Sequence, residues 1–339
     1  MDMENSPFET NQNHEDRKGS RGFQLIAQKR SSAEVEEVIE PDQPHKALFF
    51  VLAYLPLFEL LSMIQVCRLL RDAVNHDVLL WLDIFVEKPL NLRISDNILM
   101  KITSKAHGRL RTLALYGCVR ITDDGIQVVI ENNPHINKLY VPACTGITPQ
   151  GIVRAVKMLT DHNRDLKCLQ IYGLYDIKKE HLESIYSCLQ INPIQQKQQQ
   201  ASMFLAYRRI SKLRQEDATQ PIDIEICPKC TEIRLVFDCP RESCRRKREH
   251  PLTECRACYI CIPRCEECGG CIDFEELEET ACMDTLCSDC WLQLPKCNLC
   301  NKPYCNLHTD RQWIPPSSGH STGFICDVCH MIYTENLAE

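Results

Sequence analysis

Three short amphipathic helices are predicted between residues 44 and 81, where apolar residues recur at helical spacing. The first two helices carry apolar residues at positions i, i+3, i+4 and i+7, which lie on one face. Pro56 separates them, because proline ends one helix and is tolerated in the first turn of the next. Cys67 and Arg68 start the third helix, and Trp81 is available to close the packet. A unit of about 40 residues buries too little surface to be stable alone, so it needs a neighbouring domain or a partner.

A strand–helix unit recurs between residues 90 and 190. Ile94, Ile121, Ile147 and Ile177 each open one copy, at intervals of 27, 26 and 30 residues. In the first three copies Ser or Thr follows as a helix N-cap, and an amphipathic helix comes next. Apolar alternation between the helices predicts one strand per unit, and three to four units are expected to stack because one cannot bury its own apolar face. The predicted inward strand residues are Leu110, Leu113 and Leu115, then Ile136, Leu139 and Val141, then Leu166, Leu169 and Ile171.

The remaining segments differ in composition. Residues 1–43 are polar and lack periodicity, which predicts a disordered tail. Residues 191–224 include a glutamine-rich run and are expected to form a linker. The expected fold is therefore an α/β multidomain chain, with a helical packet at 44–88, stacked units at 90–190 and a small cysteine-rich module at 225–335.

Composition narrows the class of protein. Hydrophobic residues make up 44% of the chain and charged residues 25%, values typical of globular proteins. No run of about 18 apolar residues is present, so no membrane span is expected. The first residues lack the features of a secretory signal or a transit peptide, which favours the nucleus and/or the cytoplasm. The formal net charge of −7 disfavours binding to a nucleic-acid backbone.

Cysteine spacing indicates metal binding near the end of the chain. Of the 23 cysteines, eighteen lie between Cys227 and Cys329, mostly as CxxC pairs. Without a secretory signal, tandem CxxC pairs indicate metal ligation rather than disulfides. Two CxxC turns can complete a tetrahedron around one zinc ion at ~2.3 Å per thiolate, and we expect four to five structural zinc ions. The predicted ligands are Cys227, Cys230, Cys239, Cys244, Cys255, Cys258, Cys261, Cys265, Cys268, Cys271, Cys282, Cys287, Cys290, Cys297, Cys300, Cys305, His308, Cys326 and Cys329.

The grouping of these ligands is a separate expectation. The last four pairs suggest two interleaved sites, and the eleven earlier cysteines with His250 make twelve candidate ligands for three more. Cys282 stands outside any pair. Since Cys or His fills every plausible site, none keeps an open water position, so the expected role is structural rather than catalytic. The expected interleaved sites join Cys287 and Cys290 with Cys305 and His308, and Cys297 and Cys300 with Cys326 and Cys329.

The helical packet resembles an F-box, the motif that docks a protein onto the Skp adaptor of a cullin-type ubiquitin ligase. The Leu55-Pro56 break, the triplet Val66-Cys67-Arg68 and the final Leu80-Trp81 follow the family pattern in register. Leu70 stands where the family usually has tryptophan. The resemblance implies that the Skp-binding residues are Pro44, Leu48, Val51, Leu52, Leu55, Pro56, Leu60, Leu61, Val66, Cys67, Arg68 and Trp81.

The whole layout resembles plant F-box proteins of the Skp-interacting-partner group, and the stacked units resemble their cysteine-containing leucine-rich repeats. This implies a non-catalytic, substrate-recruiting subunit of an SCF (Skp–cullin–F-box) ubiquitin ligase. Its partners would be Skp, through it a cullin, and an unidentified protein target. The alternative is a RING-like ubiquitin ligase activity carried by the zinc module. Nucleic-acid binding through the basic run at 241–248 is disfavoured, because acidic residues lie nearby.

The target is expected to contact the repeats, the zinc module or both. Successive strand residues point to opposite faces, so the residues between the inward leucines are predicted to face outward. Tyrosine suits protein contacts, although it also favours strands in any setting. The predicted outward residues are Arg111, Ala114, Tyr116, Tyr140, Gln170 and Tyr172.

Overall fold

The computed structural model describes residues 47–161, 166–191, 203–205, 221–246, 255–273, 275, 277–314 and 323–335. The predicted disordered tail, Pro44 and His250 lie outside these residues. Within them, every helix is too short or too polar to cross a membrane.

The helical packet begins at Ala47. Its elements are α1 (Ala47–Val51), the 3-10 turn η1 (Leu52–Tyr54), α2 (Leu57–Val66), α3 (Arg68–His76) and the 3-10 turn η2 (Val78–Trp81). Pro56 is the N-cap of α2 and Cys67 is the N-cap of α3, both in non-helical backbone conformations. The proline break and the third helix start therefore lie where the sequence predicts them.

Trp81 anchors the packet from inside. Its side chain is fully buried, and its indole Nε1 donates a hydrogen bond of 2.8 Å to the Val74 carbonyl oxygen. Leu52, Leu60 and Leu70 are buried in the same core. Leu70, at the position where the F-box family usually has tryptophan, thus supports packing rather than contact with a partner.

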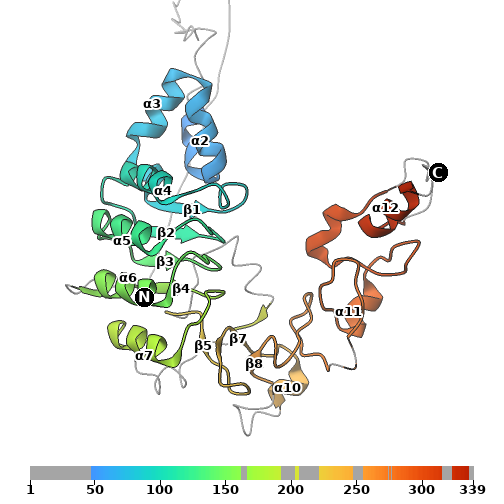
Figure 1. Cartoon of the computed structure of the whole chain (residues 1–339). Helices are drawn as coiled ribbons and strands as arrows, with labels where there is room; N and C mark the ends of the chain where they lie inside the picture. Colours follow the sequence, from blue (N-terminus) through green and yellow to red (C-terminus); the bar gives the residue numbers. More distant parts are fainter. Residues whose placement is uncertain are drawn as a thin grey trace, which may run out of the picture. The chain divides into compact units, whose positions relative to one another are not determined.

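Four parallel strands continue directly from the packet in the order β1-β2-β3-β4 (Figure 1). They are β1 (Asp83–Val86), β2 (Thr112–Leu115), β3 (Lys138–Tyr140) and β4 (Cys168–Gln170). Strand β1 lies inside the segment assigned to the helical packet from sequence. The packet and the sheet therefore share one hydrophobic core.

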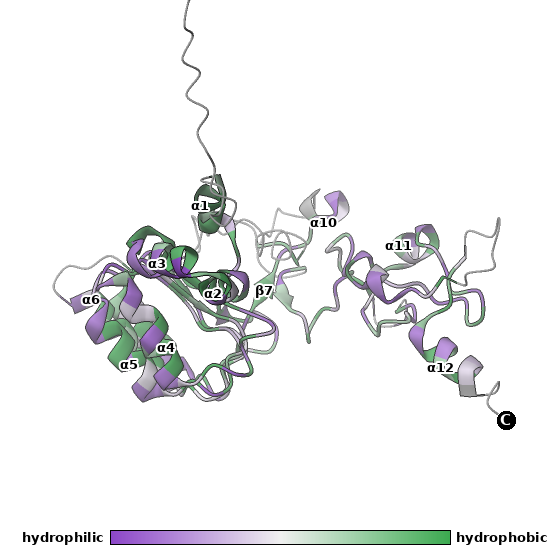
Figure 2. Cartoon of the chain, turned by 90° about the horizontal axis from the view of Figure 1, so that it is seen from above, coloured by the Kyte–Doolittle hydropathy of each residue, from purple (hydrophilic) through white to green (hydrophobic). Residues whose placement is uncertain are grey.

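One helix follows each strand and packs against the helix of the next unit. These helices are α4 (Asp96–Thr103), continued by the 3-10 turn η3 (Ser104–Ala106), then α5 (Asp123–Asn132), α6 (Pro149–Thr160) and α7 (Lys179–Cys188). They stack along one side of the sheet (Figure 1). Figure 2 shows α4, α5 and α6 with both hydrophilic and hydrophobic stripes, as the periodicity predicts. The four copies recognised in the sequence are thus four strand–helix units.

A polar ladder holds neighbouring units in register. The Thr122 amide and hydroxyl donate to the two carboxylate oxygens of Asp96 at 3.0 and 2.7 Å. In the next unit, the amide and hydroxyl of Thr148 donate to Asp123 in the same way at 2.8 and 2.6 Å. Each carboxylate fits because a glycine faces it: a Cβ on Gly151 would collide with Asp123. The ladder ends at the fourth unit, where Lys178 replaces the threonine.

Replacing Gly151 with alanine is expected to lower the free energy of unfolding of the repeats by about 1–3 kcal/mol, because the new methyl group overlaps the Asp123 carboxylate. Helix propensity alone predicts the opposite sign, since alanine is favoured over glycine by about 1 kcal/mol. Urea unfolding followed by far-ultraviolet circular dichroism measures the difference. The double variant with Asp123→Ala removes the overlap, so its loss should fall short of the sum of the single losses. Additive losses, or a stabilised Gly151→Ala variant, would contradict this explanation.

The last strand of the sheet is covered by a returning segment. Ile222 forms a parallel bridge with Leu169, and the Leu169 amide donates to the Pro221 carbonyl at 2.8 Å. The Asp223 carboxylate accepts from the Ile171 amide at 2.9 Å. Ile222 and Ile224 join the main core. The end of the predicted linker therefore protects the sheet edge, which would otherwise present unpaired backbone groups.

The cysteine-rich region contains little regular structure. Two short antiparallel pairs join β5 (Glu225–Ile226) to β6 (Ile233–Arg234) and β7 (Val236–Phe237) to β8 (Ala257–Cys258). The helices and the 3-10 turn are α10 (Glu242–Arg246), α11 (Ser288–Gln293), η6 (Asn306–Arg311) and α12 (Asp327–Glu335). Its three small cores consist largely of cysteines. Such cores bury too little apolar surface for stability, which points to metal ions.

The outward face of the sheet differs from the prediction. Ala114 and Tyr140 are buried, at 0% and 1% exposure, and they cluster with Cys168, Phe85 and Tyr116. Burial raises the pKa of the Tyr140 hydroxyl, with a further contribution from the neighbouring Cys168 thiol. Strand alternation does place these residues opposite the main core, but the aromatic side chains pack against one another instead of facing solvent.

Candidate functional sites

Apolar side chains face solvent throughout the helical packet. Tyr54 is 86% exposed, Phe50 79% and Leu79 73%. Large exposed apolar side chains are rare in the strand–helix units by comparison. A concentration of this kind marks a surface for protein contact. We call this set the packet surface: Phe50, Val51, Tyr54, Phe58, Val66, Leu69 and Leu79.

The residues predicted to bind the adaptor divide into two groups. Leu52, Leu60 and Trp81 are buried and build the packet. The others described are exposed or half-buried, and Val51 and Val66 belong to the packet surface. Most members of the packet surface were missed from sequence, because only burial distinguishes them from the inward apolar stripe. The exposed and half-buried predicted residues are Leu48, Val51, Leu55, Pro56, Leu61, Val66, Cys67 and Arg68.

Five groups of potential metal ligands lie in the cysteine-rich region, each with four ligand atoms within 4.8 Å of one another. Together they contain all eighteen cysteines of the region, one histidine and one aspartate. Each residue supplies one ligand atom, so every group can surround one ion. We name them site A (Cys227, Cys230, Cys258, Cys261), site B (Cys239, Cys244, Cys255, Cys271), site C (Cys265, Cys268, Cys287, Cys290), site D (Cys282, Asp284, Cys305, His308) and site E (Cys297, Cys300, Cys326, Cys329).

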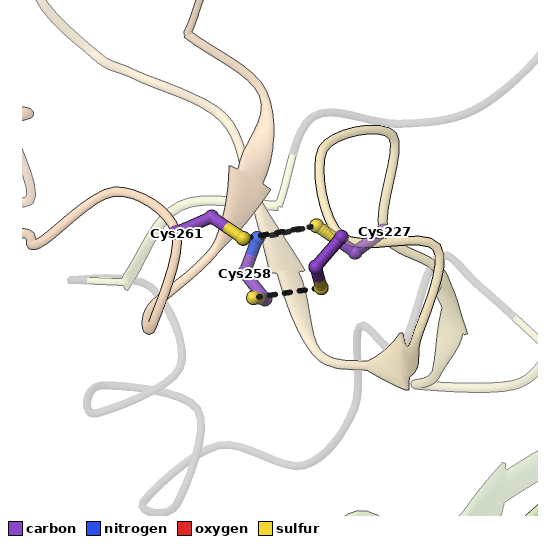
Figure 3. A group of neighbouring side chains, drawn as sticks. Cys227, Cys258 and Cys261 are labelled. Carbon is purple, nitrogen blue, oxygen red and sulfur yellow. Dashed lines mark hydrogen bonds between the residues drawn. The ribbon is translucent and has the colours of Figure 1, made fainter.

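The sulfur positions suit a tetrahedral ion. At site A, the Sγ atoms of Cys227 and Cys261 lie 4.0 Å apart and those of Cys230 and Cys258 lie 3.8 Å apart. A tetrahedron with zinc–sulfur bonds of ~2.3 Å has edges of ~3.8 Å. Figure 3 shows Cys227, Cys258 and Cys261 converging from two separate segments. The donor set and its geometry therefore fit zinc.

Backbone amides favour the thiolate form that binds metal. The Cys258 amide donates to the Cys227 sulfur at 3.3 Å, and at site E the Cys326 amide donates to the Cys297 sulfur at 3.3 Å. Burial raises the pKa of the Cys227 thiol, but amides, including those of Cys230 and Cys258, outweigh it and lower that pKa to about 6. In sites A and E, an amide from one half of the site thus favours the metal-binding thiolate form of a cysteine in the other half.

The expected grouping is correct for site E and wrong for its neighbour. Cys287 and Cys290 do not meet Cys305 and His308. They join Cys265 and Cys268 in site C instead, leaving Cys305 and His308 to Cys282 in site D. The backbone explains the pairing at site D: the Ala281 amide donates to the Pro303 carbonyl at 2.8 Å, which brings the segment before Cys282 against the segment before Cys305.

Asp284 was missed from sequence as a ligand. Its Oδ2 atom lies 2.9 Å from both the Cys305 sulfur and the His308 Nδ1 atom. The expectation that only Cys or His fills the sites is therefore wrong at site D. One feature of the sequence pointed toward Asp284. Cys282 has no CxxC partner, so a second ligand of another residue type was required near it.

The five sites interlock along the chain. Ligands of site B lie between the two halves of site A, and the ligands of C, D and E alternate with those of their neighbours in the same way. No two adjacent sites can be separated by cutting the chain once. Each ion would therefore help to hold the segments that form the next site.

A cationic side chain joins sites B and C. Arg241 lies between the site B ligands Cys239 and Cys244. Burial lowers the pKa of its guanidinium, but the Cys287 thiol of site C and the Cys271 thiol of site B outweigh burial and raise that pKa. The Arg241 side chain passes over Gly270, where a Cβ would approach its Nε to 2.7 Å. A zinc ion with four thiolates carries a net charge of −2, so a guanidinium between two such sites offsets their repulsion.

Two segments of the chain match known protein families. Residues 44–87 match the F-box-like family, and residues 223–299 match the At3g27290 F-box protein C-terminal domain. The chain is 39% identical over 308 residues to F-box protein SKIP28 of Arabidopsis thaliana, covering 89% of this chain and 95% of that protein. F-box protein SKIP14 of the same plant is 38% identical, covering 75% of this chain and 56% of that protein. The F-box resemblance is therefore confirmed, and the chain belongs to the F-box protein family that includes SKIP28.

Proposed function

We propose that this chain is a substrate-recruiting subunit of an SCF ubiquitin ligase, without a catalytic role of its own. The packet surface carries the proposal, because it exposes large apolar side chains within the segment that matches the F-box-like family. An exposed apolar surface of this kind promotes aggregation unless a partner covers it, so a permanent partner accounts for the packet surface. That partner is the Skp adaptor, and a cullin binds through it.

The mechanism is proximity. The packet surface fixes the chain to the ligase scaffold, and the remaining domains hold a target close to the charged ubiquitin carrier. Holding two reactants together replaces a bimolecular encounter with an effectively intramolecular one. The chain needs no catalytic side chain for this, and it acts in the nucleus, the cytoplasm or both.

Zinc in sites A to E gives the cysteine-rich region its structure. Four protein ligands fill the tetrahedral coordination of zinc and leave no position for a reacting water. The expected content is five ions per chain, one for each group of four ligand atoms. The alternative of a RING-like ligase gains no support from site C, because Cys287 and Cys290 do not share a site with Cys305 and His308.

The strand–helix units form a short leucine-rich-repeat solenoid that, with the zinc module, recruits the target. Tyr116 is half-buried in the cluster on the second face of the sheet, and Tyr172 is half-buried against the main core. Tyr140 is buried and is no longer a contact candidate. Repeat arrays commonly bind through an extended face of this kind. Four units offer a small face, which favours a site shared with the zinc module.

Mixing the purified chain with a Skp adaptor tests the adaptor role. We expect a 1:1 complex on size-exclusion chromatography with mass detection. The complex should form equally well when the two half-buried tyrosines are replaced by alanine (Tyr116→Ala with Tyr172→Ala), because both lie outside the packet surface. A chain that elutes alone at micromolar concentrations of both proteins would refute the proposal.

A further inference from the structure

Site D differs from the other four sites in its ligands. Sites A, B, C and E each present four thiols, whereas site D presents two thiols, one imidazole and one carboxylate. Thiolates are soft ligands that hold zinc strongly, and carboxylates are harder ligands that suit Mg²⁺, Ca²⁺ or Mn²⁺ better. Site D therefore has the weakest set of donors for zinc.

Asp284, the carboxylate ligand of site D, is also accessible to water. The side chains of Asp284 and His308 are 24% and 36% exposed. Between Cys282 and Asp284, Met283 is 94% exposed and adopts a left-handed backbone conformation with φ of 64°. This sharp turn aims the two flanking side chains at one point. It also places the ligand loop at the surface, where an incoming ligand can displace the carboxylate.

The loop keeps its shape without the metal–carboxylate bond. The Thr280 hydroxyl donates to the Asp284 carbonyl at 2.7 Å, and Lys302 forms an ion pair with Glu279. The Cys305 amide donates to the Cys282 sulfur at 3.4 Å. The Thr280 contact fixes the turn that carries Asp284, and the other two contacts join the two halves of site D without the Asp284 carboxylate. Release of the ion therefore leaves the segments in place for rebinding.

We propose that site D holds the one readily exchangeable metal ion of the module, with Asp284 as the ligand that permits exchange. The proposal rests on zinc occupying the five sites. Under it, the chain senses free zinc: four ions maintain the fold, and occupancy of the fifth follows the supply. The affected region includes the exposed Leu307, next to His308, so occupancy changes a surface available to partners.

Zinc release into a colorimetric chelator tests the proposal on the full-length chain loaded with zinc. We expect one ion per chain to leave at least tenfold faster than the other four. Release of all ions at one rate would overturn the proposal. A chain that carries no zinc by elemental analysis would instead refute the metal assignment, without bearing on Skp binding.

The Asp284→Cys variant identifies the site. It replaces the carboxylate with a third thiolate, so the fast phase should slow at least tenfold while the zinc content stays at five. The matched control is Asp289→Ala, which removes an exposed aspartate next to the site C ligand Cys290 and should leave the fast phase unchanged. A fast phase that survives unchanged in Asp284→Cys would overturn the proposal.

Cobalt substitution gives a readout that needs no variant. Cobalt–thiolate absorption scales with the number of thiolate ligands, and site D contributes two of the eighteen cysteines while each other site contributes four. The first cobalt ion removed should therefore take about one ninth of the charge-transfer absorbance with it. A first loss of about two ninths would place the labile ion at a four-cysteine site and contradict the proposal.

Discussion

Replacing Tyr54 and Phe58 with alanine is expected to abolish Skp binding at micromolar concentrations. Both aromatic side chains are exposed in the isolated chain and flank the half-buried Leu55 and the exposed Pro56. Buried aromatic anchors at interfaces cost about 2 kcal/mol or more when truncated. Each loss corresponds to about 30-fold in affinity, and the two together to about 1,000-fold if they add. Titration calorimetry with purified Skp adaptor measures the change.

The matched control is Tyr175→Ala, which removes an aromatic side chain that is 73% exposed from the repeats. It should bind Skp like the wild type. Because none of the three side chains is buried, thermal unfolding should be unchanged in both variants. Wild-type affinity in the Tyr54→Ala, Phe58→Ala variant would show that the packet surface serves another partner.

Removing the metal ions is expected to unfold the cysteine-rich region and to leave the repeats folded. A structural zinc site contributes ~10–16 kcal/mol to folding, far more than the small cysteine cores supply. The repeats and the helical packet instead share one large apolar core. Hydrogen exchange of the chelator-treated chain should show loss of protection across 225–335. Protection in β1 to β4 and α4 to α7 should persist.

Skp binding provides the control for this experiment, since the packet surface contains no metal ligand. It should survive chelation with unchanged affinity, and re-addition of zinc should restore protection in the tail. Persistent protection of the tail in strong chelator, or zinc content no higher than one ion per chain, would show that the cysteines have another role.

Local patterns in the sequence predicted the repeats and the packet well. Pro56 and Cys67 mark helix starts through backbone geometry that depends only on adjacent residues. Three helix starts of the repeats likewise follow the predicted N-caps Ser95, Thr122 and Thr148, whereas the fourth helix follows Lys178. Strand β1 was not predicted, because its four residues follow closely after Trp81 and no earlier strand–helix unit precedes them with which the repeat could be recognised.

Pairing over long distances was not predictable in the same way. Each CxxC turn offers two equivalent thiolates, so the spacing reveals ligands but not their partners. Cys287 and Cys290 could have met either of two other pairs, and backbone contacts between residues far apart in sequence, Ala281 with Pro303 and Glu266 with Thr285, decide between them. Asp284 could not be predicted as a ligand for another reason. The chain has 46 acidic residues, and acidic residues in proteins mostly lie on the surface without binding a metal ion.

Burial of strand residues also required the structure. Alternation correctly separates Leu139 from Tyr140, one on each face of the sheet, but it says nothing about what covers the second face. Tyr140 packs with Ala114 and Cys168 in a cluster separate from the main core. The pairing of residues 221–224 with β4 could not be predicted either, because a short apolar segment does not specify which distant strand it pairs with.

Recruitment of ligase activity is the most direct measurement of the adaptor role. The tagged chain is incubated with a Skp–cullin complex that carries its catalytic subunit, recovered through the tag, and assayed for ubiquitin discharge from a charged carrier. We expect discharge with the wild-type chain, none with the Tyr54→Ala, Phe58→Ala variant, and none with the chain alone. Discharge by the chain alone, or equal recovery of activity with the variant, would contradict the adaptor role.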